Sequence, residues 1–403
     1  MKLSTLDYVF SILSDRKTQL DFAFILHLPD SLTAGALEHG ALSAREKFPI
    51  TNSFLYGRQW KPLKTIDHLF AVTSDAAAVE SFMDKPFDLR VEAPYRQLLV
   101  QRTNGSTLVT RFHHAAADGL SAAMWISHQL QVALGEEPAA LCSAAPTLKR
   151  TSTAVWRSRF AYSKPSTPLQ TSTNKTSNRR RWKSFTFEGA ILKQLCRRIG
   201  GFTYNDLLAA CALEVLINWN ASAKNGSQVG LWLPMNIRSE SSSGFGNGTS
   251  RIRIYPRYDH RSSFVEKALE VRKQVKWCTE NGEWVVPEVE TIKRLPAWIS
   301  ASLLNTYLST PIVDMGTAVF SHGESLAGGV GKGLQIAERI ECVGLLQKRQ
   351  RLAINGTTHR NETCLTFTYD PDLFCNDAIT SLRDLYLEQI KLAHLELSKC
   401  VAA

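Results

Sequence analysis

The stretch RFHHAAADGL, residues 111–120, constrains the fold of this chain more than any other. It continues an alternating run of residues over 107–112, which a turn at Gly105 separates from a similar run over 95–102. Two such runs joined by a glycine-containing turn predict a β-hairpin. Apolar residues then recur at helical spacing over 120–134, which predicts a helix. The stretch therefore places two histidines where a strand passes through a loop into a helix.

The two histidines, His113 and His114, end the predicted strand. Because side chains alternate along a strand, His114 shares a face with Phe112, whereas His113 shares the opposite face with Arg111. Only one imidazole can therefore enter a given cavity. For the same reason the two rings cannot readily share an ion, and we expect no metal site. The pair is either catalytic or a pair of hydrogen-bonded residues at a strand end.

The order of His113, His114, Asp118 and Gly119 resembles the HHxxxDG signature of a large acyltransferase superfamily. This superfamily includes chloramphenicol acetyltransferases, condensation domains of nonribosomal peptide synthetases, wax ester synthases and polyketide-associated acyltransferases. Three further stretches resemble members in the same order along the chain. They are Pro86-Phe87-Asp88-Leu89, the helix start Thr203-Tyr204-Asn205-Asp206, and the strand at 231–238 with the glycine-asparagine loop at 244–250.

The stretch Gly316-Thr317-Ala318-Val319-Phe320-Ser321-His322-Gly323 departs from the superfamily. It falls where relatives place a serine or threonine, an asparagine and a glycine at a strand end. His322 stands in the position of the asparagine. The DFGWG motif of the plant HxxxD branch is absent, which argues against that branch.

The resemblance implies an α/β fold similar to chloramphenicol acetyltransferase. We expect two lobes, each a mixed sheet flanked by helices, with the active-site channel running between them. The resemblance also implies that Asp118 points away from the histidine and forms an ion pair with an arginine from the second half of the chain. Arg238 is the candidate for that arginine, although Asp118 could also be read as the carboxylate of a catalytic triad.

The candidate catalytic residues are His114, His113, Asp118 and Gly119. An imidazole has an unperturbed pKa of ~6.5, so its neutral form can take a proton from an alcohol or amine at cellular pH. We therefore predict that His114 is the general base. The three alanines at 115–117 would leave room for a narrow donor tunnel, and Gly119 would permit a tight turn into the helix.

The candidate substrate-binding residues are Asn236, Arg238, Ser321 and His322. Asn236 and Arg238 follow a buried strand. Because buried polar groups need hydrogen-bond partners, these two residues either serve the site or lock a loop.

The composition over 151–183 shifts toward Ser, Thr, Pro and Arg, which predicts a linker. We therefore place an N-terminal lobe at 1–150 and a C-terminal lobe at 184–403. The linker ends in the basic cluster at 179–183, which could meet the 3′-phosphate of coenzyme A or form a solvated run of charges.

The net charge of +10 favours anionic partners. The basic residues are spread along the chain without a nucleic-acid module, and the charge itself does not choose between nucleic acid and a phosphopantetheine donor. The resemblance implies a thioester donor, either acyl-CoA or an acyl carrier protein, and a small alcohol or amine acceptor. We expect no cofactor beyond the phosphopantetheine-bound acyl group itself. The eight cysteines show no metal-type spacing, and the sequence predicts neither a membrane span nor a signal peptide. A cytoplasmic location is therefore expected.

These features together predict an acyltransferase. One alternative is a free-standing condensation-type enzyme that joins carrier-bound intermediates, since adenylation and carrier domains are absent from the sequence. The other is a non-catalytic relative that retains the fold as a binding or docking module.

Overall fold

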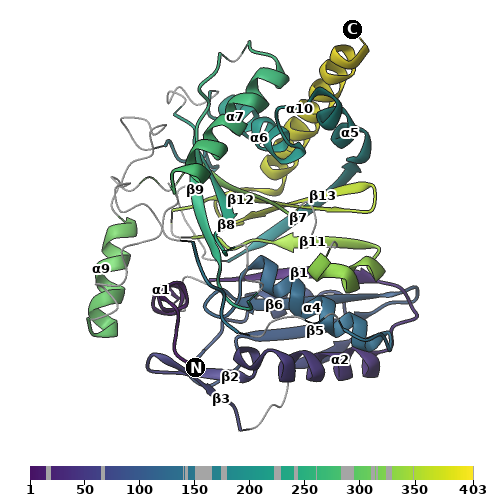
Figure 1. Ribbon diagram of the computed structural model, residues 1–403, viewed down its shortest axis with the longest axis vertical. Coiled ribbons are helices and arrows are strands. Elements are labelled where there is room, and N and C mark those ends of the chain that lie inside the picture. Colours follow the sequence, from purple (N-terminus) through teal and green to yellow (C-terminus); the bar gives the residue numbers. More distant parts are fainter. Residues whose placement is uncertain are drawn as a thin grey trace.

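The computed structural model forms two lobes, each a β-sheet covered by helices (Figure 1). The predicted architecture of mixed sheets flanked by helices is therefore confirmed. The structure describes residues 1–14, 20–64, 69–138, 140, 144–149, 166–173, 179–221, 228–239, 244–259, 261–282, 295–309, 314, 316–323, 329–347 and 349–402.

The first sheet has the strand order β11-β1-β6-β5-β4. Its strands are β1 (Asp21–Leu28), β4 (Phe70–Thr73), β5 (Tyr95–Gln101), β6 (Ser106–His113) and β11 (Arg339–Val343). Strands β5 and β6 form the predicted hairpin, and Gly105 turns it with a φ of +90°, a value that favours glycine. Strand β11 comes from the second half of the chain, so residues 339–343 of the predicted C-terminal lobe complete the sheet of the first lobe.

Helices and a short hairpin surround this sheet (Figure 1). The chain starts with α1 (Thr5–Leu13), which Ser4 caps through a reciprocal bond with Asp7. Helix α2 (Ala34–Lys47) packs against α4 (Gly119–Ala133), and the turns of η2 (Gly329–Ile336) also lie on α4. The remaining elements of this lobe are η1 (Pro49–Asn52), β2 (Ser53–Tyr56), β3 (Gln59–Pro62) and α3 (Ala78–Asp84).

The second sheet has the strand order β7-β13-β12-β10-β8-β9. Its strands are β7 (Arg181–Glu188), β8 (Leu231–Asn236), β9 (Thr249–Ile254), β10 (Ala318–Gly323), β12 (Leu352–His359) and β13 (Glu362–Tyr369). Strand β10 runs parallel to β8 and β12, and the other pairs are antiparallel. Strands β12 and β13 form a hairpin.

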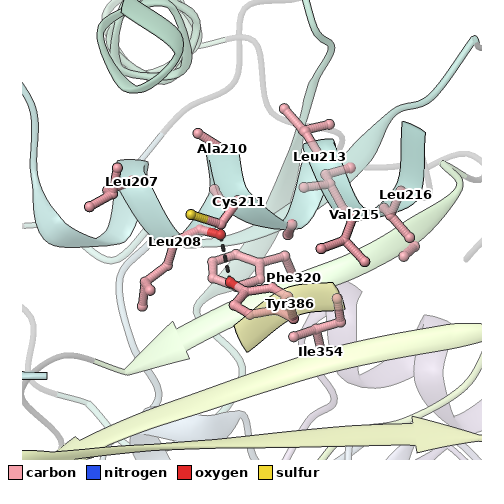
Figure 2. Packing of buried hydrophobic residues seen from close by; sticks show 14 of the residues in the cluster. Leu207, Leu208, Ala210, Cys211, Leu213, Val215, Leu216, Phe320, Ile354 and Tyr386 are labelled. Carbon is pink, nitrogen blue, oxygen red and sulfur yellow. Dashed lines mark hydrogen bonds between the residues drawn. The ribbon is translucent and has the colours of Figure 1, made fainter. Parts of the chain in front are cut away.

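Helices cover this second sheet on the side away from the first lobe (Figure 1). They include α5 (Ala190–Ile199), α6 (Tyr204–Ala221), α7 (Phe264–Glu280) and α10 (Asn376–Ala402). Helix α6 is buried along most of its length, and the hydroxyl of Tyr386 from α10 donates to the carbonyl oxygen of Leu208 at 2.6 Å (Figure 2). Helix α9 (Ala297–Ser309) lies beside α1 instead.

The predicted linker at 151–183 lies partly outside the described residues. Its residues 166–173 run along the second lobe, where Leu169 is fully buried in the core. Residues 181–183 already belong to β7, so the second lobe begins before residue 184. In the part of the chain that the structure describes, no helix has the length and apolar character needed to cross a membrane.

The sequence predicts that the basic cluster at 179–183 either meets a phosphate or is a solvated run of charges. Neither prediction holds for its central arginines, Arg180 and Arg181. Arg180 is buried and forms an ion pair with Asp21 at 2.7 Å. Arg181 pairs with Asp84 at 2.9 Å and with Glu80 at 3.2 Å. These guanidinium groups are therefore bound by the protein's own carboxylates, and they are neither a solvated charge run nor available to a phosphate.

Candidate active site

The histidine pair lies at the end of β6, a central strand of the first sheet. The backbone N–H of His114 donates to the carbonyl oxygen of Leu20 at 2.8 Å, beside the start of β1. Four residues later Asp118 caps α4 by accepting a hydrogen bond from the N–H of Ser121 at 3.0 Å. The predicted strand, loop and helix are therefore present, and the loop is fixed at both ends.

His113 is almost fully buried, with 1% of its surface exposed. Its Nδ1 accepts a hydrogen bond from the N–H of Ala115 at 3.0 Å, so its Nε2 carries the proton and donates to Oγ of Ser14 at 2.8 Å. Burial lowers the pKa of His113 to about 3. Both nitrogens are occupied by protein partners, so this ring holds the loop in place.

His114 points to the other face of the strand end, as the alternation predicts. Its ring stacks on Phe10 with centroids 4.3 Å apart and lies 5.1 Å from the ring of Phe22. Its Nδ1 is 3.1 Å from Oδ1 of Asn247. Within the described part of the chain, no side chain or backbone group bonds to its Nε2.

The protonation of His114 is biased toward the neutral form. Burial lowers its pKa, while the charge of Asp118 and the hydrogen bond with Asn247 raise it without cancelling that effect. A neutral imidazole with one nitrogen held by the protein and the other without a protein partner can act as a proton acceptor.

Asp118 forms the ion pair with Arg238 that the resemblance implies. The contact is bidentate, with distances of 2.8 and 2.9 Å, and both side chains are buried. The carboxylate also accepts bonds from the N–H of Gly248 and the hydroxyl of Thr249, both at 2.8 Å. Burial alone would raise the pKa of Asp118, but Arg238 and these donors outweigh it and the pKa is lowered.

This bonding pattern decides between the two interpretations of Asp118. Its oxygens are bonded to Arg238, the turn before β9 and the start of α4, and no hydrogen bond joins it to His114 among the described residues. Asp118 therefore connects the first lobe to the β8–β9 loop, and the triad interpretation is wrong.

Two local expectations are also wrong. Gly119 does not have a positive φ, and a Cβ built on it would meet nothing within 4 Å, so the turn into α4 does not require glycine. The alanines at 115–117 are fully buried in apolar clusters with residues such as Leu3 and Trp60. Their small size permits close packing there, and they do not line an open tunnel.

The predicted substrate-binding residues separate into two groups. Oδ1 of Asn236 accepts hydrogen bonds from the N–H of Arg238 at 3.0 Å and from its guanidinium at 3.3 Å. These two residues therefore hold the loop after β8 in place. Ser321 and His322 lie on β10 of the second sheet, where His322 bonds to Oγ1 of Thr358 at 2.8 Å. No contact between these two residues and His114 is seen in the described part, and their roles stay predictions.

Sequence reasoning missed several side chains around His114. Asn247 and Phe10 contact its ring, and Asp7 bonds to Asn247 at 2.7 Å. The glycine-asparagine loop was a signal for Asn247, and the sequence Ser4-x-x-Asp7 predicts a helix cap. Neither signal indicates that the two residues meet, because 240 positions separate them.

No protein-family model matches this chain, and no curated protein matches its sequence. Solved structures do match. The first condensation domain of the calcium-dependent antibiotic synthetase is 12% identical with a TM-score of 0.70, and the match covers 98% of this chain and 96% of that one. TRI3 trichothecene 15-O-acetyltransferase from Fusarium sporotrichioides is 11% identical with a TM-score of 0.67, covering 98% and 95%. The X-domain from teicoplanin biosynthesis, solved in complex with OxyB, is 15% identical with a TM-score of 0.61, covering 98% and 93%. At these identities the likeness establishes the fold.

Proposed function

We propose that this chain, which has the two-lobed fold shared by condensation domains and an acetyltransferase, transfers an acyl group from a thioester to a hydroxyl or amine. The observation that supports this proposal best is the state of His114. Its Nδ1 is held by Asn247, burial lowers its pKa, and its Nε2 is left without a protein partner among the described residues.

The reaction follows from this arrangement. Neutral His114 takes the proton of the acceptor O–H or N–H through Nε2 as the acceptor atom attacks the thioester carbonyl. The carbon–sulfur bond of the resulting intermediate then breaks, and the imidazolium returns the proton to the leaving thiolate. Because a positioned acceptor attacks directly, no covalent acyl-enzyme is needed. General-base assistance of this kind usually contributes a factor of about 10² to 10⁴ in rate.

The donor is acyl-CoA or an acyl carrier protein, since both present the acyl group on phosphopantetheine and both carry negative charge. The net charge of +10 supports an anionic donor of either kind. A free-standing condensation-type enzyme is the alternative among enzymes, and neighbours of similar fold include condensation domains. Donor preference separates the two, because a carrier-dependent enzyme ignores acyl-CoA.

A binding or docking module is the alternative from another class. The X-domain, which was solved in complex with OxyB, has a similar fold. Under this alternative the chain binds a protein or a thioester without turnover. For its location we propose the cytoplasm, because the cysteines of the described residues, such as Cys342 and Cys364, are free thiols, as is usual in that reducing compartment.

The test measures thiol release from a panel of acyl-CoA and acyl-carrier thioesters with mixed alcohols and amines. The variant is His114→Ala, and the matched control is His39→Ala, since His39 is an exposed histidine on α2. The thiols of the protein, such as exposed Cys375 and Cys400, are subtracted with an enzyme-only reaction.

We expect turnover by the wild type and by His39→Ala, with a loss of about 10² or more in kcat for His114→Ala. The best donor then decides between CoA and carrier. Equal rates for His114→Ala and wild type would contradict the general base. Binding of a thioester or carrier without any turnover would replace the proposal with the docking module.

A further inference from the structure

The side-chain amide of Asn247 connects His114 to the first helix of the chain. Its Nδ2 is 2.7 Å from Oδ1 of Asp7 and 2.6 Å from the carbonyl oxygen of His114. Its Oδ1 is 3.1 Å from Nδ1 of His114. Only 2% of the surface of Asn247 is exposed, so water does not replace these contacts.

These contacts fix which end of the amide faces the imidazole. A backbone carbonyl oxygen can only accept a hydrogen bond, and so can an ionised carboxylate. The two oxygens therefore require the NH₂ group of Asn247, which has one hydrogen for each. The amide oxygen is left to face Nδ1 of His114.

The orientation of the amide in turn fixes the tautomer of the histidine. Because the oxygen of Asn247 can only accept, Nδ1 of His114 must carry the proton. In the neutral ring Nε2 then holds a lone pair. The opposite tautomer would place a lone pair against the amide oxygen and an N–H at the position where the base must accept.

Asp7 is itself held in place. Its Oδ2 accepts from the N–H of Ser4 at 3.0 Å, within the capping box of α1. The first turn of a helix favours a negative charge. Burial raises the pKa of Asp7, and the bonds from Asn247 and Ser4 act against that rise.

We propose that Asp7 and Asn247 are positioning residues that hold His114 in the Nδ1–H tautomer. This inference rests on the proposed function for its consequence, because only a base needs a free lone pair on Nε2. Asn247 contacts the ring directly, whereas Asp7 acts through Asn247. The neutral amide also differs from a carboxylate partner, since it orients the ring without adding a charge that would raise its pKa strongly.

The primary test is ¹⁵N NMR of protein labelled at histidine, which reports the ring nitrogen that carries the proton and needs no substrate. The signal of His114 is assigned by its loss in His114→Gln. We expect the Nδ1–H tautomer in the wild type and a population of the Nε2–H tautomer in Asn247→Leu. We expect a smaller population of the Nε2–H tautomer in Asp7→Asn than in Asn247→Leu, because the carbonyl oxygen of His114 still orients Asn247 in that variant.

Ser4→Ala is the matched control. It removes the hydroxyl that caps α1 but leaves the N–H of Ser4 for Asp7 and leaves Asn247 untouched. A purely structural role of Asp7 in α1 predicts the same effect for Ser4→Ala and Asp7→Asn. We expect Ser4→Ala to keep the wild-type tautomer. If Asn247→Leu does not fold, Asp7→Asn compared with Ser4→Ala carries the same test.

Kinetics provide a second readout. We expect Asn247→Leu to lower kcat by about 10- to 10³-fold, below or near the full contribution of a general base. The hydrogen bond with Asn247 raises the pKa of His114, so its removal shifts the acid limb of the pH–rate profile to lower pH. Loss of fold would lower the rate at every pH without this shift.

The outcomes separate the two proposals. An Nε2–H tautomer in the wild type, or an unchanged Nδ1–H tautomer in both Asn247→Leu and Asp7→Asn, would overturn the inference even if the enzyme is active. Absence of turnover with the expected tautomers would overturn the proposed function and leave the positioning intact.

Discussion

The two adjacent histidines have different chemistry because their environments differ. The ring of His113 is enclosed by the protein and both of its nitrogens are bonded, whereas the ring of His114 is held at one nitrogen only. Burial lowers the pKa of both rings, but only His114 keeps a nitrogen without a protein partner in the described part. The alternation of side chains along β6 produces this difference within one dipeptide.

The buried state of His113 makes the stability of the protein depend on pH. Its pKa is lowered from 6.5 to about 3 in the fold, so between these values the unfolded chain binds a proton that the folded chain does not. Stability rises with pH wherever the unfolded state binds more protons. We therefore expect His113 to reduce the free energy of unfolding as the pH falls through this range, by about 1.4 kcal/mol per pH unit at most.

Urea unfolding between pH 7 and pH 4 measures this effect. His113→Gln should be less stable than the wild type at pH 7, because the packing of the ring is lost, but its stability should fall less steeply with acid. The control His39→Gln changes an exposed histidine and should keep the wild-type slope. An equal dependence of stability on pH in His113→Gln and the wild type would contradict the lowered pKa of His113.

The residues of the site could be predicted only in part. The resemblance supplied His114, Asp118 and the pairing with Arg238, because these follow a motif with fixed spacing. Asn247 and Asp7 could not be placed beside His114, since their contact depends on how α1 lies against the β8–β9 loop. No local pattern in either segment reports that arrangement.

At the scale of elements, the loop between β8 and β9 has the most demanding geometry. Gly246 has a φ of +136°, and a Cβ on Gly248 would lie 2.5 Å from Cγ and 2.6 Å from Nη1 of Arg238. The loop therefore needs glycine so that its backbone can approach Arg238. The same backbone supplies the N–H of Gly248 to Asp118 and carries Asn247.

We expect Gly248→Ala to displace either the loop or Arg238 and to weaken the ion pair with Asp118. The activity should fall by about tenfold or more, because Asn247 moves with the loop and misplaced catalytic groups lose that much. The melting temperature should also fall. Steady-state kinetics and thermal unfolding measure the two effects.

Gly35→Ala is the control for Gly248→Ala. Gly35 lies in the first turn of α2, and a Cβ there meets nothing within 4 Å. Alanine favours a helix over glycine by up to about 1 kcal/mol, so this variant should be as stable as the wild type or more so, with unchanged activity. Wild-type activity in Gly248→Ala would show that the loop adjusts without moving Asn247.

The elements themselves were predictable where their patterns are long. The hairpin β5–β6, helix α6 and the hairpin β12–β13 follow from alternation or continuous apolar runs. Strands β2 and β3 have only four residues each and little alternation, so they give no signal. Strand β11 is only one residue longer. Its pairing with β1 depends on the return of the chain from the second lobe to the first, which periodicity does not report.

At the scale of the whole molecule, two buried ion pairs join the lobes on either side of the histidine pair. Asp118 and Arg238 form one of them, after the loop. Asp21 forms the other, since it lies opposite His113 in the sheet and binds Arg180, the residue before β7, at 2.7 Å. Arg111 binds the same carboxylate at 2.9 Å. The segment that carries His114 is thus connected to the second lobe at both of its ends, through Arg111 and Asp21 on one side and through Asp118 on the other.

The charge of Asp21 depends on both arginines. Burial alone would raise its pKa, but Arg111 and Arg180 outweigh burial and lower the pKa to about 2. The carboxylate therefore stays ionised above that pH, and it stabilises the fold most at pH values above the ordinary aspartate range. Removal of the Arg180 guanidinium leaves Arg111 as the remaining arginine partner of Asp21.

We expect Arg180→Met to lower the free energy of unfolding at pH 7 by about 1.5 to 3 kcal/mol, the usual contribution of a hydrogen bond to a charged group. The loss should also reduce activity at temperatures below unfolding, because the strand end that carries His114 loses one attachment to the second lobe. Calorimetry and kinetics on the same samples measure both.

Arg179→Met is the matched control, since Arg179 forms an exposed ion pair with Asp372 at 3.4 Å, and exposed pairs contribute about 0 to 1 kcal/mol. Equal stability of the two variants would show that the ion pair between Asp21 and Arg180 does not stabilise the contact between the lobes, and that Asp21 serves only Arg111 within the first sheet.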